Sequence, residues 1–294
     1  MIAKIIDGKL IAKKVKEEIK AEVAELIDDN NDTPHLVAII VGEDAASQTY
    51  VASKEKAARN VGITSSVYRY PAETTEEELL NTIDFINNDD EVNGLIVQLP
   101  LPDHINVNKV IEHISPDKDV DGFHPINVGK MAIGQPSFIS ATPAGVMELL
   151  KRYKVETEGK HCVVLGRSNI VGSPLSILMS KKTNPGNATV TICHSKTHDL
   201  PSITKQADIL ICAIGSPEFV TADMIKKDAV VIDVGIHRVP ADTEKGYKIV
   251  GDVNFDEVSR KASFITPVPG GVGPMTIAML LKNTLLSFKK EFNQ

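Results

Sequence analysis

The sequence has no cluster of Lys and Arg residues and no long apolar run, and its 294 residues carry a formal net charge of -7. Because nucleic acids select basic surfaces, this charge balance argues against a nucleic-acid partner. No apolar stretch is long enough to span a bilayer, and the first residues lack the apolar core of a signal peptide. We therefore expect a soluble, cytoplasmic protein without a membrane partner.

Cysteine is also scarce, with three residues in the chain. Cys162, Cys193 and Cys212 lie far apart and flank or sit in apolar segments. This is not the spacing of a metal site, so the sequence predicts buried free thiols and no bound metal.

Strand-like runs alternate with helix-like segments, which is typical of a parallel sheet covered by helices. The expected strands are residues 36–41, 66–70, 94–98, 161–165, 188–193, 209–214 and 229–234. Helices are expected through Lys54, after the capping box formed by Thr75 and Glu78, and over residues 174–179. The predicted fold class is α/β.

The length of 294 residues suggests two domains. Thr142 and Pro143 are typical of a helix start, with Thr as the cap and Pro at the first helical position, so we place the domain boundary there. After the loop of residues 267–274, residues 275–288 have helical apolar spacing. This last helix can fold back across either domain.

Tyr50 and Lys54 are four residues apart on the helix that follows the strand of residues 36–41. Side chains at this spacing emerge on the same helix face, so a phenol and an ammonium can handle protons together. The alternative, a solvated helix lysine, is the commoner role of such a residue.

A glycine turn, Gly166-Arg-Ser-Asn-Ile-Val-Gly172, joins an apolar strand to a helix. Backbone N–H groups at such a turn bind a pyrophosphate, although the spacing is not that of the common dinucleotide motif. A P-loop is excluded because Ser173-Pro174 stands where that motif needs Lys and Ser or Thr. The alternative interpretation is a tight strand-to-helix turn that binds no ligand.

The next strand ends at His194-Ser195-Lys196, where NAD-binding domains place an acidic residue for the ribose 2′-hydroxyl. A carboxylate would repel a 2′-phosphate, whereas Arg167, Ser195 and Lys196 attract one. The sequence therefore favours NADP over NAD.

Polar side chains also follow strands in the first half of the chain. Gln98 closes one strand, and Asp121 lies in a loop sequence with Gly and Pro. Ligands of open α/β sheets bind at the carboxyl ends of strands, which makes both residues site candidates. The alternative for each residue is an ordinary structural role, Gln98 as a loop hydrogen-bond partner and Asp121 as a turn residue. His124 receives no catalytic role.

With these residues in place, the whole chain resembles the bifunctional methylenetetrahydrofolate dehydrogenase and methenyltetrahydrofolate cyclohydrolase family, the FolD proteins. The similar segments appear in the family's order and span most of the chain. They are Tyr50-Val-Ala-Ser-Lys54, Gly94-Leu-Ile-Val-Gln-Leu-Pro-Leu-Pro102, Lys118-Asp-Val-Asp-Gly-Phe-His-Pro125, Gly166-Arg-Ser-Asn-Ile-Val-Gly-Ser-Pro174 and Pro267-Val-Pro-Gly-Gly-Val-Gly-Pro-Met-Thr276.

The resemblance implies a cytoplasmic homodimer that acts on tetrahydrofolate derivatives with NADP in one-carbon metabolism. It implies a folate-binding catalytic domain of residues 1–141, completed by 275–294, and a Rossmann-type NADP-binding domain of residues 142–274. The catalytic and substrate-binding residues that it implies are Tyr50, Lys54, Gln98 and Asp121, with Gly270, Gly271 and Val272 in the cleft wall. The implied cofactor-binding residues are Gly166, Arg167, Ser168, Ser195 and Ile236.

Two positions depart from the family pattern. Ala141 stands before Thr142-Pro143, where many members have cysteine, and Ser173 stands where many have arginine. The second departure leaves fewer charges at the phosphate site.

Three other readings remain. Short-chain dehydrogenases also use Tyr and Lys four apart, but there the pair follows the dinucleotide turn, whereas here it precedes it. A shikimate-dehydrogenase-like enzyme has the same substrate-then-cofactor layout without segments 94–102 and 267–276. A non-enzymatic dinucleotide-sensing module would have no need of Tyr50, Lys54, Gln98 and Asp121 together.

Overall fold

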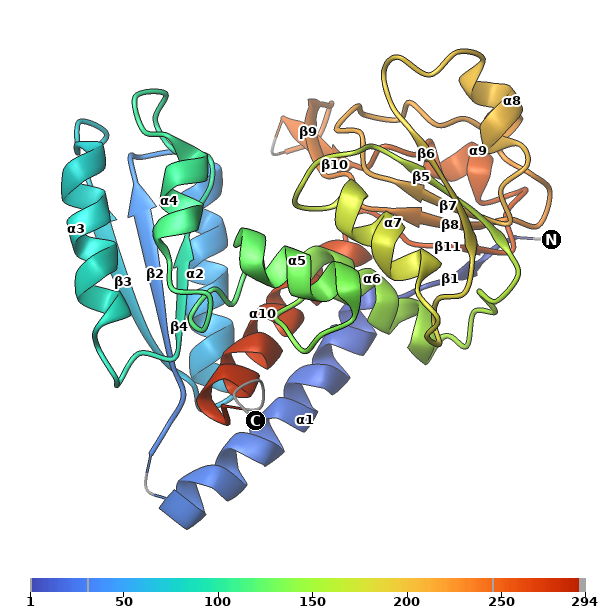
Figure 1. Cartoon of the computed structure of the whole chain (residues 1–294). Helices are drawn as coiled ribbons and strands as arrows, with labels where there is room; N and C mark the ends of the chain where they lie inside the picture. Colours follow the sequence, from blue (N-terminus) through green and yellow to red (C-terminus); the bar gives the residue numbers. More distant parts are fainter. Residues whose placement is uncertain (1, 31, 245, 291–294) are drawn as a thin grey trace. The chain divides into compact units, whose positions relative to one another are not determined.

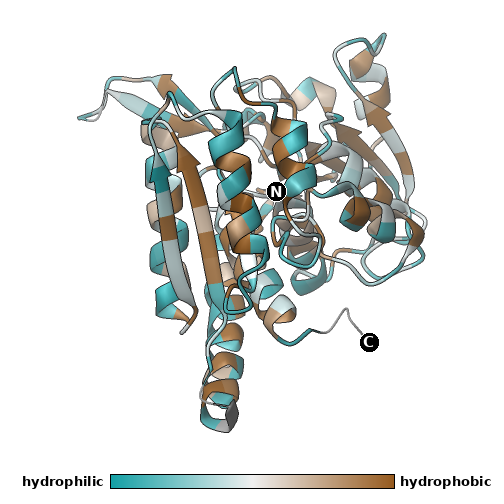
Figure 2. Cartoon of the chain, turned by 60° about the vertical axis from the view of Figure 1, so that its left-hand side comes forward, coloured by the Kyte–Doolittle hydropathy of each residue, from teal (hydrophilic) through white to brown (hydrophobic). Residues whose placement is uncertain are grey.

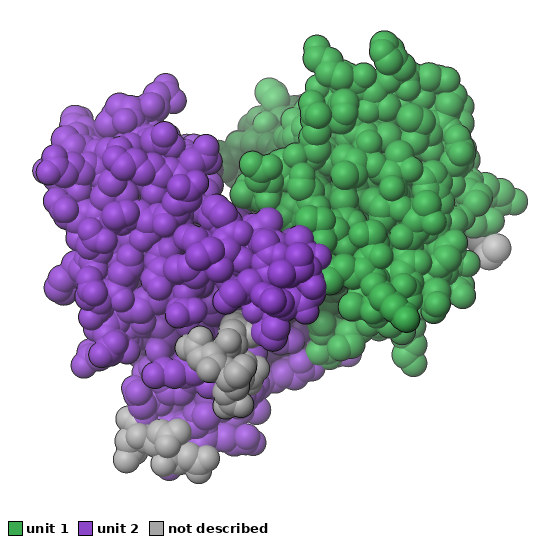
Figure 3. All heavy atoms as spheres, in the orientation of Figure 1, with its two compact units in different colours: residues 1–12, 142–276 green, residues 13–141, 277–294 purple. Residues whose placement is uncertain are grey.

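The chain folds into two compact units (Figure 3): unit 1 contains residues 1–12 and 142–276, and unit 2 contains residues 13–141 and 277–294. The structure, a computed structural model, describes residues 2–30, 32–244 and 246–290. The chain passes between the units within helix α1 (Gly8–Asn30), at the start of α6 (Ala141–Arg152) and within α10 (Val272–Phe288). Each unit has its own parallel sheet, which confirms the predicted α/β class.

Unit 2 is built on a three-stranded parallel sheet with the order β3-β2-β4 (Figure 1). The strands are β2 (His35–Val41), β3 (Thr64–Tyr70) and β4 (Gly94–Val97). The helices that follow them are α2 (Ala45–Asn60), α3 (Glu76–Asn87), α4 (Val107–His113) and α5 (Pro125–Ile133). The capping box at the start of α3 forms as predicted, because the Thr75 side chain accepts from Glu78 N–H and the Glu78 carboxylate accepts from Thr75 N–H.

Unit 1 contains a six-stranded parallel sheet with the order β1-β11-β8-β7-β5-β6. Its strands are β1 (Lys4–Ile5), β5 (His161–Leu165), β6 (Thr189–Cys193), β7 (Ile209–Cys212), β8 (Val230–Asp233) and β11 (Phe264–Ile265). Its other elements are α7 (Gly172–Ser180), α8 (Leu200–Thr204), a 3-10 turn (Ala222–Met224), α9 (Phe255–Val258) and the antiparallel hairpin of β9 (His237–Pro240) and β10 (Tyr247–Val250).

Two details differ from the expectations. Residues 1–12 belong to unit 1, because β1 pairs with β11 at the edge of the large sheet, whereas the sequence placed them with the catalytic domain. The helix expected to start with Thr142 as its cap begins at Ala141, so Thr142 and Pro143 lie inside its first turn. The Thr142 hydroxyl instead lies 2.9 Å from that of Thr276.

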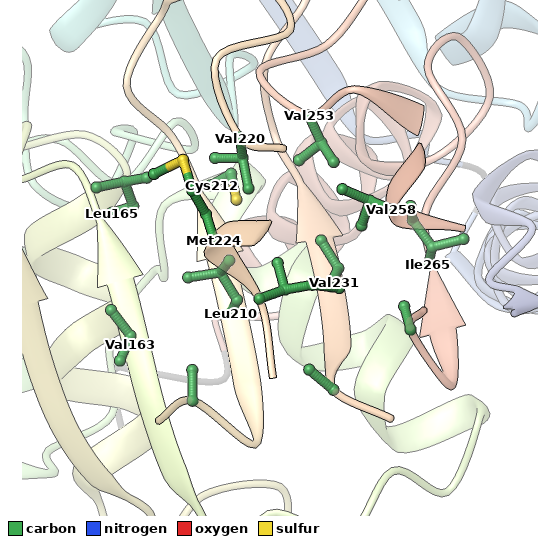
Figure 4. Packing of buried hydrophobic residues seen from close by; sticks show 14 of the residues in the cluster. Val163, Leu165, Leu210, Cys212, Val220, Met224, Val231, Val253, Val258 and Ile265 are labelled. Carbon is green, nitrogen blue, oxygen red and sulfur yellow. The ribbon is translucent and has the colours of Figure 1, made fainter. Parts of the chain in front are cut away.

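Apolar side chains from both faces of the strands form the cores. In unit 1, a cluster that includes Val163, Leu210 and Val231 packs between strands and the adjoining elements (Figure 4). In unit 2, residues of β2 and β4 pack against α3 and α4. Hydrophobic residues run along the strands and one side of the covering helices, with polar residues on the other side (Figure 2). This is the pattern expected when helices bury one face against a sheet.

The three cysteines are buried free thiols, as predicted. Burial raises the pKa of the Cys162 thiol to about 12, so this thiol stays protonated at neutral pH.

Candidate active site and nucleotide-binding site

Helix α2 in unit 2 presents Lys54 and Tyr50 on one face. The Lys54 side chain is only 5% exposed, and its Nζ lies 4.7 Å from the centroid of the Tyr50 ring. The helix is fixed at its start by Asp44, whose carboxylate accepts a hydrogen bond from Ser47 N–H. The Lys54 amine is therefore buried over an aromatic face, which excludes the interpretation as a solvated helix lysine.

Gln98 directly follows β4 and contacts Lys54 of this pair. Lys54 Nζ donates a hydrogen bond to Gln98 Oε1 at 3.2 Å, and Gln98 Nε2 donates to the Leu99 carbonyl at 2.7 Å. The backbone N–H of Gln98 donates to the Ile39 carbonyl, so the central strand β2 sets its position. The amide is therefore oriented with its oxygen toward the ammonium.

Asp121 lies in the loop that follows α4, and three features fix this loop. Asp119 accepts hydrogen bonds from the N–H groups of Phe123 and His124 and from the Asn127 amide. Gly122 has a φ of +71°, and a side chain there would clash with the backbone of Ser140. Asn283 of α10 donates to the Val120 carbonyl at 2.8 Å and to the Ile139 carbonyl at 2.9 Å.

Burial and charge act in opposite directions on the pKa values of Lys54 and Asp121. Burial lowers the pKa of the Lys54 ammonium, and the Asp121 carboxylate partly offsets this effect. Burial likewise raises the pKa of the Asp121 carboxyl, and Lys54 acts in the opposite sense. The two side chains are thus electrostatic partners, and both are shifted toward their neutral forms. Such perturbed groups are typical of catalytic sites.

In unit 1 the glycine turn leaves β5 and enters α7. Gly166 has a φ of +120°, and a side chain there would clash with the Ala213 carbonyl. A side chain at Gly172 would clash with the Gly166 carbonyl, so both glycines allow close backbone packing. Arg167 and Ser168 are exposed at the end of the strand, and α7 has no side-chain cap. This is the geometry of a phosphate-binding helix start.

Ser195 lies at the same edge of the sheet, because β6 pairs in parallel with β5 and Leu165 is opposite Cys193. The turn after β6 is closed by Thr197, whose hydroxyl accepts a hydrogen bond from His194 N–H. Ser195 and Lys196 are both exposed. Ile236 follows β8 farther along this edge and is 66% exposed. A dinucleotide across the strand ends would meet these residues in turn.

Gly270, Gly271 and Val272 belong to unit 1 and lead into α10. Gly270 has a φ of +110°, and its carbonyl accepts a hydrogen bond from Lys9 N–H. A side chain at Gly8 would clash with the Gly271 carbonyl, so α1 and this loop pack backbone to backbone. The structure thus brings Tyr50, Lys54, Gln98 and Asp121 together in unit 2, and places this loop with the nucleotide-site residues in unit 1.

Sequence reasoning missed Asn283 and Asp252. Asn283 is a buried amide in a mostly apolar helix, and that contrast was the available signal. Asp252 is fully buried, but its partners are distant in sequence and no local pattern marks them.

Within residues 2–30, 32–244 and 246–290, no three His, Cys, Asp or Glu side chains are grouped so as to hold a metal ion. None of the helices in this described part has the length and apolar character needed to cross a membrane.

Two family models match the chain. Residues 6–121 match the tetrahydrofolate dehydrogenase/cyclohydrolase catalytic domain, and residues 140–292 match the NAD(P)-binding domain of the same family. A protein of Bacteroides fragilis called "Bifunctional protein FolD" is 60% identical over 291 residues, which cover 99% of each chain.

Solved structures agree with these matches. The bifunctional methylenetetrahydrofolate dehydrogenase/cyclohydrolase of Campylobacter jejuni is 50% identical with a TM-score of 0.92, covering 98% of this chain and 99% of that one. The Trypanosoma brucei enzyme, solved with NADP and an inhibitor, is 41% identical with a TM-score of 0.94, covering 100% of both chains. With both family domains present, the chain belongs to the tetrahydrofolate dehydrogenase/cyclohydrolase family of bifunctional enzymes.

Proposed function

We propose that the protein oxidises 5,10-methylenetetrahydrofolate to the 5,10-methenyl cation with NADP and then hydrolyses this cation to 10-formyltetrahydrofolate. The observation that carries the proposal is the buried Lys54, which contacts Tyr50 and Gln98 and is coupled electrostatically to Asp121. A buried amine with these partners is suited to proton handling on a bound substrate.

The dehydrogenase step needs mainly alignment of two rings. When NADP is bound, its nicotinamide supplies the oxidising power by accepting a hydride. The chain's contribution is to orient the folate and the cofactor, and no side chain acts as an acid or base in this step. We therefore assign Lys54 to proton transfer in the second reaction, the hydrolysis of the methenyl cation.

In the cyclohydrolase step, water adds to the methenyl carbon and loses one proton. The bond from this carbon to N5 then breaks as N5 gains a proton and the added hydroxyl loses its own, which leaves the 10-formyl group. Lys54 accepts the proton from the attacking water. Burial lowers the pKa of Lys54, which increases the fraction of neutral amine available for this role. Gln98 holds Lys54 Nζ through its amide oxygen, and Tyr50 orients the substrate.

Asp121 binds the pterin ring. A carboxylate accepts two hydrogen bonds, which matches the amino group and the adjacent ring N–H of a pterin. The loop around Asp121 is held from both sides by Asp119 and Asn283, so this acceptor is preorganised. We assign Gly270, Gly271 and Val272 to substrate binding as well.

Gly166, Arg167 and Ser168 bind the diphosphate region of NADP, and Ile236 contacts its nicotinamide end. Arg167 and Ser195, with Lys196 beside them, bind the 2′-phosphate. Both Arg167 and Ser195 are exposed at the ends of neighbouring parallel strands, and no acidic residue stands in the segment His194-Ser195-Lys196. A charge-assisted hydrogen bond to a phosphate then favours NADP over NAD.

At the level of domains, unit 2 binds the folate and unit 1 binds NADP. The enzyme works as a cytoplasmic homodimer in one-carbon metabolism, without nucleic-acid or membrane partners. Its 10-formyl product supplies purine biosynthesis, and the folate derivatives that it interconverts serve histidine and methionine biosynthesis. Sedimentation equilibrium tests the dimer, since a monomer at micromolar concentration would contradict it.

A turnover assay tests the proposed function. The purified chain is given NADP and methylenetetrahydrofolate, and the nicotinamide and methenyl absorbances are followed together. We expect reduced nicotinamide to accumulate while the methenyl signal rises and then decays faster than in buffer. Absence of NADP reduction would favour a dinucleotide-sensing module instead.

A further inference from the structure

Asp252 holds the loop that follows β7 in unit 1. Its side chain is fully buried, and its Oδ2 accepts hydrogen bonds from the N–H groups of Ile214 at 2.7 Å and Gly215 at 3.2 Å. Its Oδ1 accepts from Ser216 N–H at 2.9 Å. Three successive backbone donors at the carboxyl end of a central strand therefore converge on one carboxylate.

His237 connects the same carboxylate to the segment that follows β8. His237 Nε2 lies 2.7 Å from Asp252 Oδ1, and the histidine comes directly after the exposed Ile236. The hairpin of β9 and β10 makes this contact possible, because Val250 pairs with His237 and the chain returns to Asp252 two residues later. Asp252 thus links two loops from neighbouring strands.

A second buried carboxylate, that of Asp233, fixes Asp252 in turn. Asp233 Oδ1 accepts from the N–H groups of Gly235 and Asp252, both at 2.9 Å, and Oδ2 accepts from Val253 N–H at 3.0 Å. Side chains at Gly235 or Gly251 would clash with these carboxylates. Every oxygen of the two carboxylates accepts at least one hydrogen bond, and all but one of the donors are backbone N–H groups, so the pair fixes the backbone around it.

We propose that Asp252 and His237 are positioning residues for the nicotinamide end of the cofactor site. They hold residues 214–216 and 234–236, at the carboxyl ends of β7 and β8, in one arrangement before the cofactor binds. Dinucleotides bind at this edge of a parallel sheet, and loops that are already ordered lose less entropy on binding. The inference rests on the proposed use of NADP. It assigns Asp252 and His237 an indirect role, since they act through the loops that they hold and not by contact with the substrate.

The test compares His237→Leu with His237→Gln, because a glutamine Nε2 can replace the imidazole donor and leucine cannot. NADP binding is measured by calorimetric titration, together with the KM values for NADP and for methylenetetrahydrofolate. We expect His237→Leu to weaken NADP binding by about tenfold, as for loss of a hydrogen bond to a charged group, and His237→Gln to restore most of it. The KM for the folate and the hydrolysis of added methenyltetrahydrofolate should stay within about twofold of wild type.

His161→Leu is the matched control. His161 also donates or accepts one side-chain hydrogen bond, to Thr191 at 2.9 Å, but it lies at the amino end of β5, opposite the cofactor edge. Wild-type NADP affinity in His237→Leu, or an equal loss in His161→Leu, would overturn the inference. So would a loss in His237→Leu that glutamine does not restore. If the wild type itself bound no NADP, the proposed function would fail instead, which separates the two results.

Discussion

At the residue scale, the candidate site depends on the burial of a few charged groups. Lys54 and Asp121 are two site candidates whose pKa values are shifted. Both shifts have burial as their largest cause, so the protein uses folding free energy to keep these groups away from water. Residues with this property are expected to matter for activity more than for stability.

Lys54→Met tests the proton-handling role. Methionine keeps the apolar stem of lysine and removes its charge and its exchangeable protons. Cyclohydrolase activity should fall by about 10²-fold or more, which is the range for losing a general acid or base. Dehydrogenase activity should survive in part, so methenyltetrahydrofolate accumulates and is followed by its absorbance.

Lys56→Met is the control for this variant, since Lys56 is exposed on the same helix. It should retain both activities. Hydrolysis of added methenyltetrahydrofolate by Lys54→Met at the wild-type rate would remove Lys54 from the role and make Tyr50 the next candidate.

Asp121→Ala tests pterin binding. Loss of hydrogen bonds to a charged group should weaken binding of a folate analogue by roughly 1.5–3 kcal/mol and reduce both activities, while NADP affinity hardly changes. Calorimetric titration measures both affinities. Asp117→Ala removes an exposed carboxylate from the same loop and serves as the control. Equal folate affinity in wild type and Asp121→Ala would exclude Asp121 from the site.

Arg167→Ala tests the phosphate contact. The ratio of kcat/KM for NADP to that for NAD should exceed one in the wild type and fall by about tenfold in the variant, because a charge-assisted hydrogen bond is lost only with NADP. NAD turnover is the internal control for an intact site. A wild type that prefers NAD, or a variant with an unchanged ratio, would show that Arg167 does not bind the 2′-phosphate.

At the scale of elements, the last helix, α10, holds the loop that contains Asp121. Helix α10 carries an apolar surface, yet Asn283 within it is buried and donates to the carbonyls of Val120 and Ile139. One of these carbonyls is adjacent to Asp121 in sequence. The helix therefore supports the candidate site loop through directed hydrogen bonds as well as through apolar packing.

Asn283→Ala should consequently affect folate binding. Two buried carbonyls lose their donors, which costs about 1–3 kcal/mol of stability and loosens the Asp121 loop. We expect the KM for the folate to rise several-fold in both reactions, with NADP affinity unchanged. Urea denaturation and steady-state kinetics provide the measurements.

Ser287→Ala is the matched control on the same helix. The Ser287 hydroxyl contacts the carbonyls of Asn93 and Asp117 rather than that of Val120. It should lower stability while leaving the folate KM near wild type. An equal rise in KM for both variants would mean that α10 contributes only general stability.

At the scale of the whole molecule, a buried carboxyl makes stability depend on pH. Burial raises the pKa of Asp119 from 3.8 to about 6, while hydrogen bonds from Asn127, His124 and Phe123 act in the opposite direction. The folded state therefore binds this proton more tightly than the unfolded state does. Its stabilising contribution is complete below about pH 4 and is lost as the pH rises through about 6.

Asp119→Asn removes this titration. The free energy of unfolding of the wild type, relative to the variant, should fall by on the order of 3 kcal/mol between pH 4 and pH 7, because one pKa unit corresponds to about 1.4 kcal/mol. Urea denaturation of both proteins across this range measures the difference, in which titrating groups that do not interact with Asp119 cancel. A difference that is constant or grows with pH would contradict the raised pKa.

The sequence by itself determined the α/β class, the main strands and the family. Buried parallel strands are short continuous apolar runs, and the capping box at Thr75 is local, so neighbouring residues carry the information. The Tyr50 and Lys54 pair was also visible, since helical spacing alone puts both on one face. The candidate site could be named because its motifs are continuous segments.

Only the tertiary structure decided what surrounds these residues. The pairing of β1 with β11, the clamp of Asn283 on Val120 and the contact of His237 with Asp252 join residues whose local sequences carry no sign of each other. The same is true of the burial of Lys54, which depends on how strands and loops close around α2. Desolvation and hydrogen bonding are set by three-dimensional packing, so their consequences for pKa and preorganisation emerge only once the chain is folded.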